Sequence, residues 1–413
     1  MGLNPAAPSK CLNWVKLLKL KTQRAFTAIT LATFFAMFGD TISQSFQPLF
    51  IAGLGVTPAV VALIYSIKNV TQTFLRPVSG ALSDSIGRKN MMLFSMALFA
   101  ITPFIYSVAQ TPTMPVLAMF VSGLALSIYY PPSETYASSL YPSERAGETM
   151  GRHHLSWAAS AIIGPAAGGY LVKFFPNYRP LFVVSGLITA LGFLLIWRYM
   201  ENDRDDSCPM KPGVQVQMVL SEFPSTVRRL LGNRKMAAAS VAVFAHTFCH
   251  WGLVTFIPLL GVEMGMNELM IGLTLTANAV VIAVSLPSVG SFSERVGRFT
   301  PISAGLLLSV AAFVFLPLAP RHWMLPILNA VLGLCAVLVL PVSQAATMEA
   351  LPPGDRGSAS EVWRMIMSLG GTLGMFTMSG VLYLASIEWV FYSSAAVTFT
   401  FFLVLVFLKD YFY

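Results

Sequence analysis

Long apolar stretches, separated by short polar segments, run through nearly the whole chain. About twelve of them approach the ~20 residues that a helix needs to cross ~30 Å of hydrocarbon. This pattern predicts an all-α integral membrane protein with twelve transmembrane helices, and the even number places both ends of the chain on one side. The predicted helices begin near Ala25, Pro58, Asn90, Met114, Ser156, Leu181, Ala237, Glu268, Pro301, Trp323, Val362 and Trp389.

The pattern repeats once, at a spacing of about 210 residues. The segment GALSDSIGRK at 80–89 recurs as GSFSERVGRF at 290–299, and the same offset places Pro131 on Pro341. Chance similarities would not keep one register. We therefore expect two six-helix bundles, related by a pseudo-twofold axis along the membrane normal, with a path between them as in transporters.

Composition favours the same class of protein. Of the 413 residues, 55% are hydrophobic and 11% are charged, and the mean hydropathy is +0.69. A soluble domain of this size could not bury so much apolar surface, whereas a bilayer accepts it. The four cysteines, Cys11, Cys208, Cys249 and Cys335, have no ligand spacing, so neither a disulfide framework nor a structural metal is expected, and no cofactor is indicated.

The distribution of charge predicts the topology. Lys and Arg concentrate in the N-terminal arm, the central linker and every second short loop, whereas the opposite loops hold only Lys173, Arg179 and Arg321. This asymmetry predicts a protein of the plasma (inner) membrane with both termini in the cytoplasm. The net charge of +8 is therefore a topology signal. The expected partner is the lipid bilayer, and nucleic acid is excluded.

Four segments follow from these patterns. We expect a cytoplasmic arm at residues 1–24, an N-terminal bundle at 25–200, a cytoplasmic linker at 201–235 and a C-terminal bundle at 236–413. The arm contains WVKLLKLK at 14–21, which indicates a short basic helix lying on the inner leaflet. The second part of the linker alternates apolar residues with arginines and predicts another interfacial helix.

The loop after the second predicted helix combines a turn with a charge pattern. Gly80 allows another helix to approach, Asp84 can face a helix N-terminus, and Gly87 permits a tight turn before Arg88 and Lys89. These residues match the G-x-L-x-D-x-x-G-R-K signature, so the chain resembles the major facilitator superfamily over essentially its whole length.

The second copy of this loop strengthens the resemblance. It retains Gly290, Glu294, Gly297 and Arg298 at the corresponding positions. The resemblance implies that Asp84 and its neighbouring arginine latch the cytoplasmic gate of an outward-open state. The alternative is a positively charged loop that only makes a turn.

The fifth predicted helix is rich in small residues. Gly151, Gly164, Pro165, Gly168 and Gly169 are spaced to share mostly one face of a kinked, closely packed helix. With Ser160 in place of the middle glycine, the segment resembles a signature of the drug:proton antiporters of this superfamily. Small residues also serve ordinary helix packing. The arginine that these antiporters carry in the fourth helix, four residues before a glycine, is replaced here by Met119 before Gly123.

Several ionisable groups fall at membrane depth. Asp40, Lys68 and Glu134 lie within the first, second and fourth predicted helices, and His246 and His250 lie one turn apart in the seventh. Such groups cost ~2.5–3.5 kcal/mol each on insertion scales and need a partner or a wet cavity. The two histidines have no carboxylate at metal-ligand spacing, which favours cavity lining over a metal site.

The repeat register aligns Asp40 with His250 and Lys68 with Asn278. The resemblance implies that the first, fourth, seventh and tenth helices line a central cavity, across which Asp40 and His250 would face each other. We hypothesise that Asp40 is the main protonation site, with Glu134 as its rival. The alternative is a structural ion pair between Asp40 and Lys68 that locks two helices.

The residues next to these charges suggest a solute class. Gln44 and Tyr130 join other aromatic and amide groups on the predicted cavity wall. Aromatic faces near buried acids suit lipophilic cations, whereas Lys68 favours an anionic or zwitterionic solute.

We therefore expect a secondary transporter that exports small amphipathic or drug-like molecules in exchange for protons, acting as a monomer. A symporter or uniporter for a small metabolite, such as a sugar, an organic ion or a lysolipid, is the first alternative. A non-transporting membrane sensor is the second, although the chain offers no sizeable soluble output domain. No Ser/His pair, metal triad or nucleotide loop indicates an enzyme.

Overall fold

The computed structural model describes residues 7–141, 146–201, 212–319, 321–352 and 355–412. Side chains within these ranges are described except at 7–21, 77, 80, 81, 83–85, 146, 147, 212–216, 218–220, 222 and 223. The helices are α1 (Ala7–Gln44), α2 (Gln47–Ala52), α3 (Pro58–Ile86), α4 (Arg88–Val108), α5 (Thr113–Ser139), α6 (Ala146–Val172), α7 (Arg179–Tyr199), α8 (Pro212–Leu231), α9 (Arg234–His250), α10 (Leu253–Glu263), α11 (Glu268–Val296), α12 (Phe299–Phe315), α13 (Met324–Glu349), α14 (Arg356–Leu384) and α15 (Ile387–Phe407).

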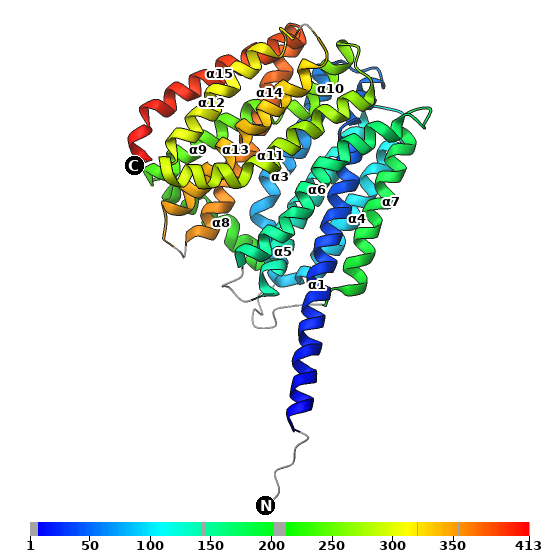
Figure 1. Ribbon diagram of the computed structural model, residues 1–413, viewed down its shortest axis with the longest axis vertical. Coiled ribbons are helices and arrows are strands. Elements are labelled where there is room, and N and C mark those ends of the chain that lie inside the picture. The colour runs from blue at the N-terminus through cyan, green and yellow to red at the C-terminus, as the bar shows by residue number, and fades with distance from the viewer. Residues whose placement is uncertain (1–6, 142–145, 202–211, 320, 353–354, 413) are drawn as a thin grey trace, which may run out of the picture.

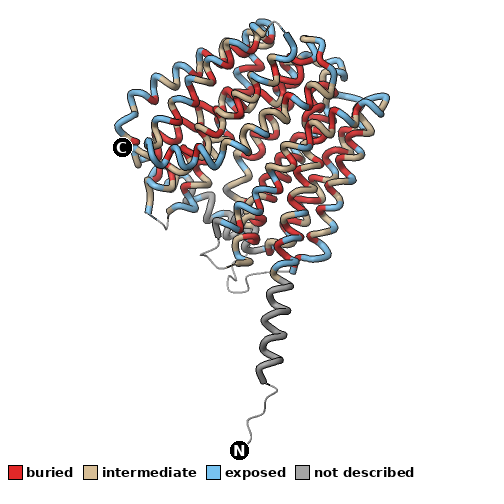
Figure 2. Tube along the Cα trace, in the orientation of Figure 1, coloured by how far each residue is buried: buried red, intermediate tan, exposed pale blue. Residues whose placement is uncertain are grey.

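The predicted membrane helices are present. Within the described residues, 10 helices are long and apolar enough to span a bilayer, and α3 and the shorter apolar α12 complete the expected set. Helix α7 shows why a bilayer is needed, because Leu187, Leu191 and Leu194 recur at helical spacing and lie exposed on its outer side. Buried residues run along the inward sides of the helices (Figure 2).

Two spans are interrupted, which the hydropathy pattern did not predict. The first stops at Gln44 and resumes as α2, where Pro48 occupies the first helical turn. The seventh stops at His250 and resumes after Gly252 as α10. Both breaks fall near the same place in the repeat, at 45–46 and 251–252, so an interrupted first span is a feature of each half.

Helix packing follows the repeat (Figure 1). In the first half α1 packs on α6 and α7, α3 on α5, and α4 on α5 and α7. In the second half α9 packs on α14 and α15, α11 on α13, and α12 on α13 and α15. Every pair in one half thus has its counterpart in the other. The halves meet along α3–α14 and α6–α11, two pairs that the pseudo-twofold axis exchanges.

We call the face that carries residues 86–88, 139–141, 146–148, 199–201, 212–234, 296–299, 349–352 and 355–356 the linker face, and the other end the opposite face. The first part of α1 lies on the linker side, where Phe26 packs on Tyr141. Helix α15 ends on the same side, and the Arg234 guanidinium at the start of α9 lies 5.3 Å from the ring centroid of Tyr411. Helix α8, predicted as an interfacial segment, packs mainly on α3 there. The interfacial helix expected at 14–21 lies outside the described side chains and stays a prediction.

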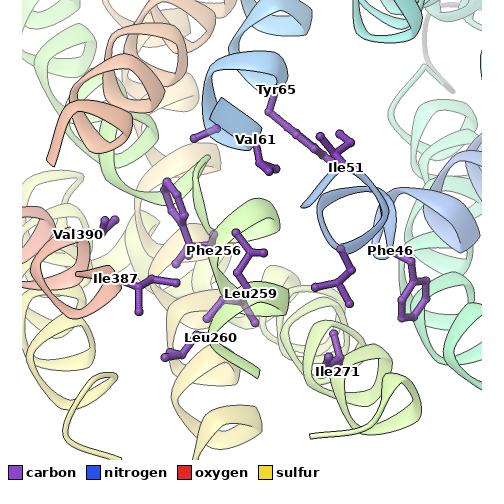
Figure 3. Packing of buried hydrophobic residues seen from close by; sticks show 14 of the residues in the cluster. Phe46, Ile51, Val61, Tyr65, Phe256, Leu259, Leu260, Ile271, Ile387 and Val390 are labelled. Carbon is purple, nitrogen blue, oxygen red and sulfur yellow. The ribbon is translucent and has the colours of Figure 1, made fainter. Parts of the chain in front are cut away.

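The opposite face is sealed by a buried apolar cluster that joins both halves (Figure 3). Ile51, Val61 and Tyr65 come from the first half, and Phe256 and Leu260 from the second. At ~25 cal/mol per Å² of apolar surface, burying several large side chains contributes several kcal/mol to this closure. The cluster therefore holds the two halves together at this end.

Polar contacts add to the seal at the opposite face. The Tyr178 hydroxyl donates a hydrogen bond of 3.1 Å to the Glu268 carboxylate across the two halves. Burial and the neighbouring carboxylate raise the pKa of Tyr178 above its ordinary value, so the phenol remains a donor. Ser379 of α14 likewise donates to the carbonyl oxygen of Ala59 at 2.7 Å.

Glycines show which end is closed. A Cβ atom on Gly169 would lie 2.5 Å from the carbonyl oxygen of Glu268, and one on Gly272 would lie 2.3 Å from that of Pro165. At the linker face, a Cβ on Gly151 of α6 or on Gly290 of α11 meets nothing within 4 Å. Helices α6 and α11 are therefore in backbone contact near the opposite face and separated near the linker face.

Candidate functional site

A cavity of about 450 Å³ lies between the halves. Asp40 and Gln44 of α1, Lys68 of α3, Tyr130 of α5 and His250 of α9 all reach its wall. The structure thus brings together five of the residues that sequence analysis predicted for a cavity. A second cavity of about 310 Å³ adjoins it through shared walls and is lined by His246 and Asn278.

Asp40 and Lys68 form an ion pair inside this cavity. The Lys68 Nζ lies 3.7 Å from the Asp40 carboxylate, and their side chains are only 11% and 16% exposed. Each charge partly offsets the other's cost at membrane depth, because the pair shares a site where water is scarce. The structure therefore contains the ion pair of the structural alternative and also places Asp40 in a cavity, as the coupling hypothesis expects.

The histidines lie on α9 as predicted. His246 and His250 stack with ring centroids 3.8 Å apart, and His250 Nε2 lies 3.3 Å from the Ser309 hydroxyl. In the second cavity the Asn278 amide donates to the carbonyl oxygen of Asn329 at 2.7 Å. No group of three potential metal ligands occurs among the described residues. The histidines are buried polar members of the cavity wall.

Glu134 lies beside the cavity and not in its wall. Its carboxylate accepts hydrogen bonds of 3.0 and 3.3 Å from the Arg364 guanidinium of the other half. Arg364 lies three residues after Glu361, a spacing that allows an intrahelical pair, but its hydrogen bonds reach across to Glu134 of α5. The three side chains line a small hollow together with Arg76.

Arg76 is the cavity residue that sequence analysis missed. Its guanidinium lines the main cavity and donates to Gln72 Oε1 at 2.8 Å and to the carbonyl oxygen of Arg364 at 3.3 Å. The signal was the spacing of Lys68, Gln72 and Arg76, four residues apart, which places all three on one face of a helix. Proximity to the end of the second span made this arginine resemble an ordinary loop charge.

The rest of the wall is aromatic or contains methionine. Tyr130 meets Trp157 edge to face at 5.4 Å, and Trp251 lies over the bare backbone of Gly371. Met367 and Met375 of α14 add polarizable, adaptable surface. Such walls accept varied apolar groups and leave specificity to the charged residues.

The gate loop in the first half has the backbone that its sequence suggested. Gly87 adopts φ 97° between α3 and α4, a conformation that favours glycine. Lys89 donates to the carbonyl oxygen of Met200 at 2.5 Å, and Arg88 follows Gly87 at the start of α4. The side chains at Gly80 and Asp84 lie outside the described residues, so the latch stays a prediction.

The second copy of the loop is better defined. Gly297 adopts φ 83°, and Arg298 pairs with Glu349, which also binds Lys235 at 3.3 Å. These contacts stay within the second half. Glu294 and Gly290 are exposed at the linker face, as expected where the halves are apart.

The glycine-rich segment of α6 packs on two helices. A Cβ on Gly164 would overlap Thr41 of α1, and one on Gly168 would overlap Ile42, whereas Gly169 faces α11 of the other half. Pro165 lies inside the helix, beside Gly272. The segment thus joins α1, which carries Asp40, to the contact between the halves. Gly151, at the other end of α6, touches neither.

Comparison with known proteins identifies the architecture. The model of the Major Facilitator Superfamily matches residues 29–270 and, in a second match, residues 239–412. The chain belongs to the Major Facilitator Superfamily. It is therefore a multi-pass membrane protein and a secondary transporter, not an enzyme, and the fold predicted from the repeat is confirmed.

Relatives and solved structures of the superfamily extend the comparison. The multidrug resistance protein MdtG of Salmonella typhimurium is 24% identical over 334 residues, covering 78% of this chain and 80% of the relative. MdtG of Citrobacter koseri is 24% identical over 332 residues, covering 78% and 79%.

Two solved structures share the fold. A POT family transporter in complex with 5-aminolevulinic acid superposes with a TM-score of 0.76 at 13% identity, over 94% of this chain and 96% of that one. The human organic anion transporter MFSD10 gives a TM-score of 0.66 at 17% identity, over 93% and 99%. At these identities the structures support the fold alone.

Proposed function

We propose that this transporter exports small amphipathic molecules in exchange for protons. The observation that carries the proposal is the Asp40–Lys68 pair, 3.7 Å apart in a cavity with aromatic and methionine walls between the two halves. A carboxylate in such a place can exchange a proton when its partner or its solvation changes. The similarity to multidrug resistance proteins supports export of drug-like solutes.

The proposed cycle uses the two ends of the α6–α11 contact. The structure is closed at the opposite face and separated at the linker face, so a solute enters from the linker side while Asp40 is ionised. Rocking of the halves closes the linker face and opens the other. A proton from outside then neutralises Asp40, and the solute leaves. The excess of positive loops at the linker face supports placing that face in the cytoplasm of an inner-membrane protein.

Two roles for the acids follow. Asp40 carries the proton, because it lines the cavity where the solute binds. Glu134 acts differently, since its carboxylate is held by Arg364 and lies outside the main cavity wall. We further propose that one chain suffices for transport, because the cavity is enclosed by helices of a single chain.

A second candidate is symport of a zwitterionic metabolite. The adjacent opposite charges of Asp40 and Lys68 would match the two charged groups of such a solute. In that mechanism the solute and the proton move in the same direction. The direction of the gradient effect therefore separates the two candidates.

The test is transport by purified protein in liposomes. A fluorescent amphipathic dye is loaded inside, and its efflux is followed with and without a pH gradient that drives protons inward. Acceleration of efflux by the gradient in the wild type, and no acceleration in Asp40→Asn, supports antiport. Arg152→Gln, a change at an exposed surface arginine, is the matched control. Equal efflux with and without the gradient would indicate a uniporter, and efflux slowed by the inward gradient would indicate a symporter.

A further inference from the structure

The side chains that line the main cavity include more cations than acids. Lys68 is paired with Asp40. The other cations that line the main cavity are Arg76 and Arg364, and no further acid among the described residues reaches this wall. Two arginines thus line the cavity near its linker end, while the acids Glu134 and Glu361 lie behind them in the small hollow.

Arg76 forms no ion pair or hydrogen bond with an acid among the described residues. Its two hydrogen bonds go to neutral acceptors, the amide of Gln72 and the carbonyl oxygen of Arg364. Glu361 and Glu134 lie in the small hollow behind it and attract it electrostatically, but neither is hydrogen-bonded to it. A guanidinium has five N–H donors, so donors of Arg76 remain for an anion in the cavity that it lines.

Arg364 contributes an unused donor at the same place. One of its terminal nitrogens is bound by Glu134, but its buried Nε atom has no hydrogen-bond partner in the described structure. A buried donor without an acceptor costs about 1–3 kcal/mol. The backbone carbonyl of Arg364 also accepts a hydrogen bond of 3.3 Å from the Arg76 guanidinium, and both arginines line the same cavity and the same small hollow.

The repeat shows that a helix in this position does not need the charge of Arg76. The register that aligns Lys68 with Asn278 places Leu286 at the position of Arg76 in the second half. Leu286 is 46% exposed, and α11 still packs on α13 and α6, as α3 packs on α5 and α14. The arginine is therefore specific to the side of the cavity that the first half forms.

We propose that Arg76 and Arg364 form a subsite for the anionic head group of an amphipathic solute, such as a carboxylate, sulfonate or phosphonate. The inference rests on the proposed export of amphipathic molecules through this cavity and names their charge. The apolar body of the solute packs on Trp157, Trp251 and Met367. Two guanidinium groups suit a planar or tetrahedral oxyanion, because each presents several N–H donors in a fixed plane.

Binding to purified protein tests this without transport. Protein in phosphatidylcholine nanodiscs is titrated by calorimetry with octane-1-sulfonate, octyltrimethylammonium and 1,2-octanediol, and empty nanodiscs are subtracted. We expect the sulfonate to bind more tightly than the other two. Arg76→Gln should weaken sulfonate binding about tenfold to a hundredfold, the range for a lost charge-assisted hydrogen bond, and change diol binding less than about twofold.

Two further variants keep the test sharp. Arg76→Lys retains the charge and should keep most of the sulfonate affinity, which also controls for folding. Arg152→Gln removes an exposed arginine outside the cavity and should leave all three affinities unchanged. Equal sulfonate affinity in Arg76→Gln and the wild type, or tighter binding of the ammonium probe, would overturn the subsite.

The outcomes separate this inference from the proposed function. Charge-dependent binding in a protein that shows no gradient-driven efflux would leave the anion subsite in place and remove proton-coupled export. Gradient-driven efflux with charge-independent binding would support proton-coupled export and overturn the anion subsite. Titration in nanodiscs containing phosphatidylglycerol identifies the source of the anion: competition with the sulfonate indicates a lipid head group, and its absence indicates a dissolved solute.

Discussion

The guanidinium of Arg364 on α14 lies 3.0 Å from the carboxylate of Glu134 on α5, and this ion pair joins the two halves of the transporter. The two side chains are 25% and 24% exposed, so solvent screens the pair only in part. The pair lies beside the cavity, toward the linker face, whereas the apolar cluster seals the opposite face. In this conformation the apolar cluster joins the halves at the opposite face and the ion pair joins α5 to α14 beside the cavity, whereas α6 and α11 are separated toward the linker face.

The pair predicts a measurable coupling between the halves. Glu134→Gln and Arg364→Gln should each destabilise the protein, and the double variant should cost less than the sum of the two. We expect a coupling free energy of about 1–2 kcal/mol, between the values for exposed and buried pairs. A double-mutant cycle on thermal unfolding in detergent measures it. Strict additivity would show that the two residues act independently.

Replacing a glycine of α11 by a larger residue should have opposite effects at the two ends of its contact with α6. Gly272→Leu places a side chain where a backbone carbonyl lies 2.3 Å from the Cβ position, so it should open the opposite face. Gly290→Leu meets nothing within 4 Å in this conformation and should instead hinder closure of the linker face. The first change should favour a closed linker face and the second an open one.

Spin labels on α6 and α11 can report this shift. Cysteines replace Arg152 and Ser291, both exposed near the linker face, after Cys11 and Cys208 are changed to serine. Double electron–electron resonance measures the distance between the two spin labels. This distance should be shorter in Gly272→Leu and longer in Gly290→Leu than in the labelled parent. Identical distance distributions in all three proteins would rule out rocking about this contact.

The helices and their pairing were predictable because both depend on local or repeated patterns. A run of about twenty apolar residues specifies a span by itself, and the 210-residue repeat relates each helix pair in one half to one in the other. Gly87 and Gly297 were predictable for the same reason, since a turn needs only its own residues. Sequence analysis therefore yielded the architecture and five of the residues that line the main cavity.

Contacts between the halves were not predictable from one sequence. Arg364 meets Glu134 across 230 positions of chain, and nothing in the spacing of either residue identifies the other. Glu361 is nearer in the sequence, and its spacing from Arg364 allows a local pair, but the hydrogen bonds of Arg364 go to Glu134. Arg76 was overlooked because hydropathy treats an arginine at a span end as a loop charge, although its spacing from Lys68 placed it on the same face.

The Asp40–Lys68 pair separates coupling from structure. If Asp40 carries the proton, Asp40→Asn should yield folded protein in normal amounts that no longer responds to a pH gradient. If the pair is a structural lock, the same change should lower the thermal midpoint by several degrees, because it leaves Lys68 uncompensated in the membrane. The double variant Asp40→Asn with Lys68→Gln removes both charges and should restore stability under either reading.

Gradient-driven efflux by the double variant shows whether Asp40 carries the proton or only pairs with Lys68. Restored stability without a response to the gradient supports Asp40 as the proton carrier. Restored stability together with a full response would transfer that role to another acid, and Glu134 would be the first to test. Ser160→Gly serves as the control for altered helix packing, because this substitution changes the neighbouring α6 without removing a charge.

The turn glycines predict a cost of backbone strain that is separate from transport. Gly87 has φ 97° and Gly297 has φ 83°, where an L-residue is strained by about 1–3 kcal/mol. Gly87→Ala and Gly297→Ala should therefore each lower the free energy of unfolding by about that amount. Gly290→Ala, at an exposed helical position with open space around it, should cost no more than about 1 kcal/mol and can even stabilise the helix. Chemical denaturation in detergent compares the three, and an equal effect at all three positions would mean that the strained turns contribute nothing of their own.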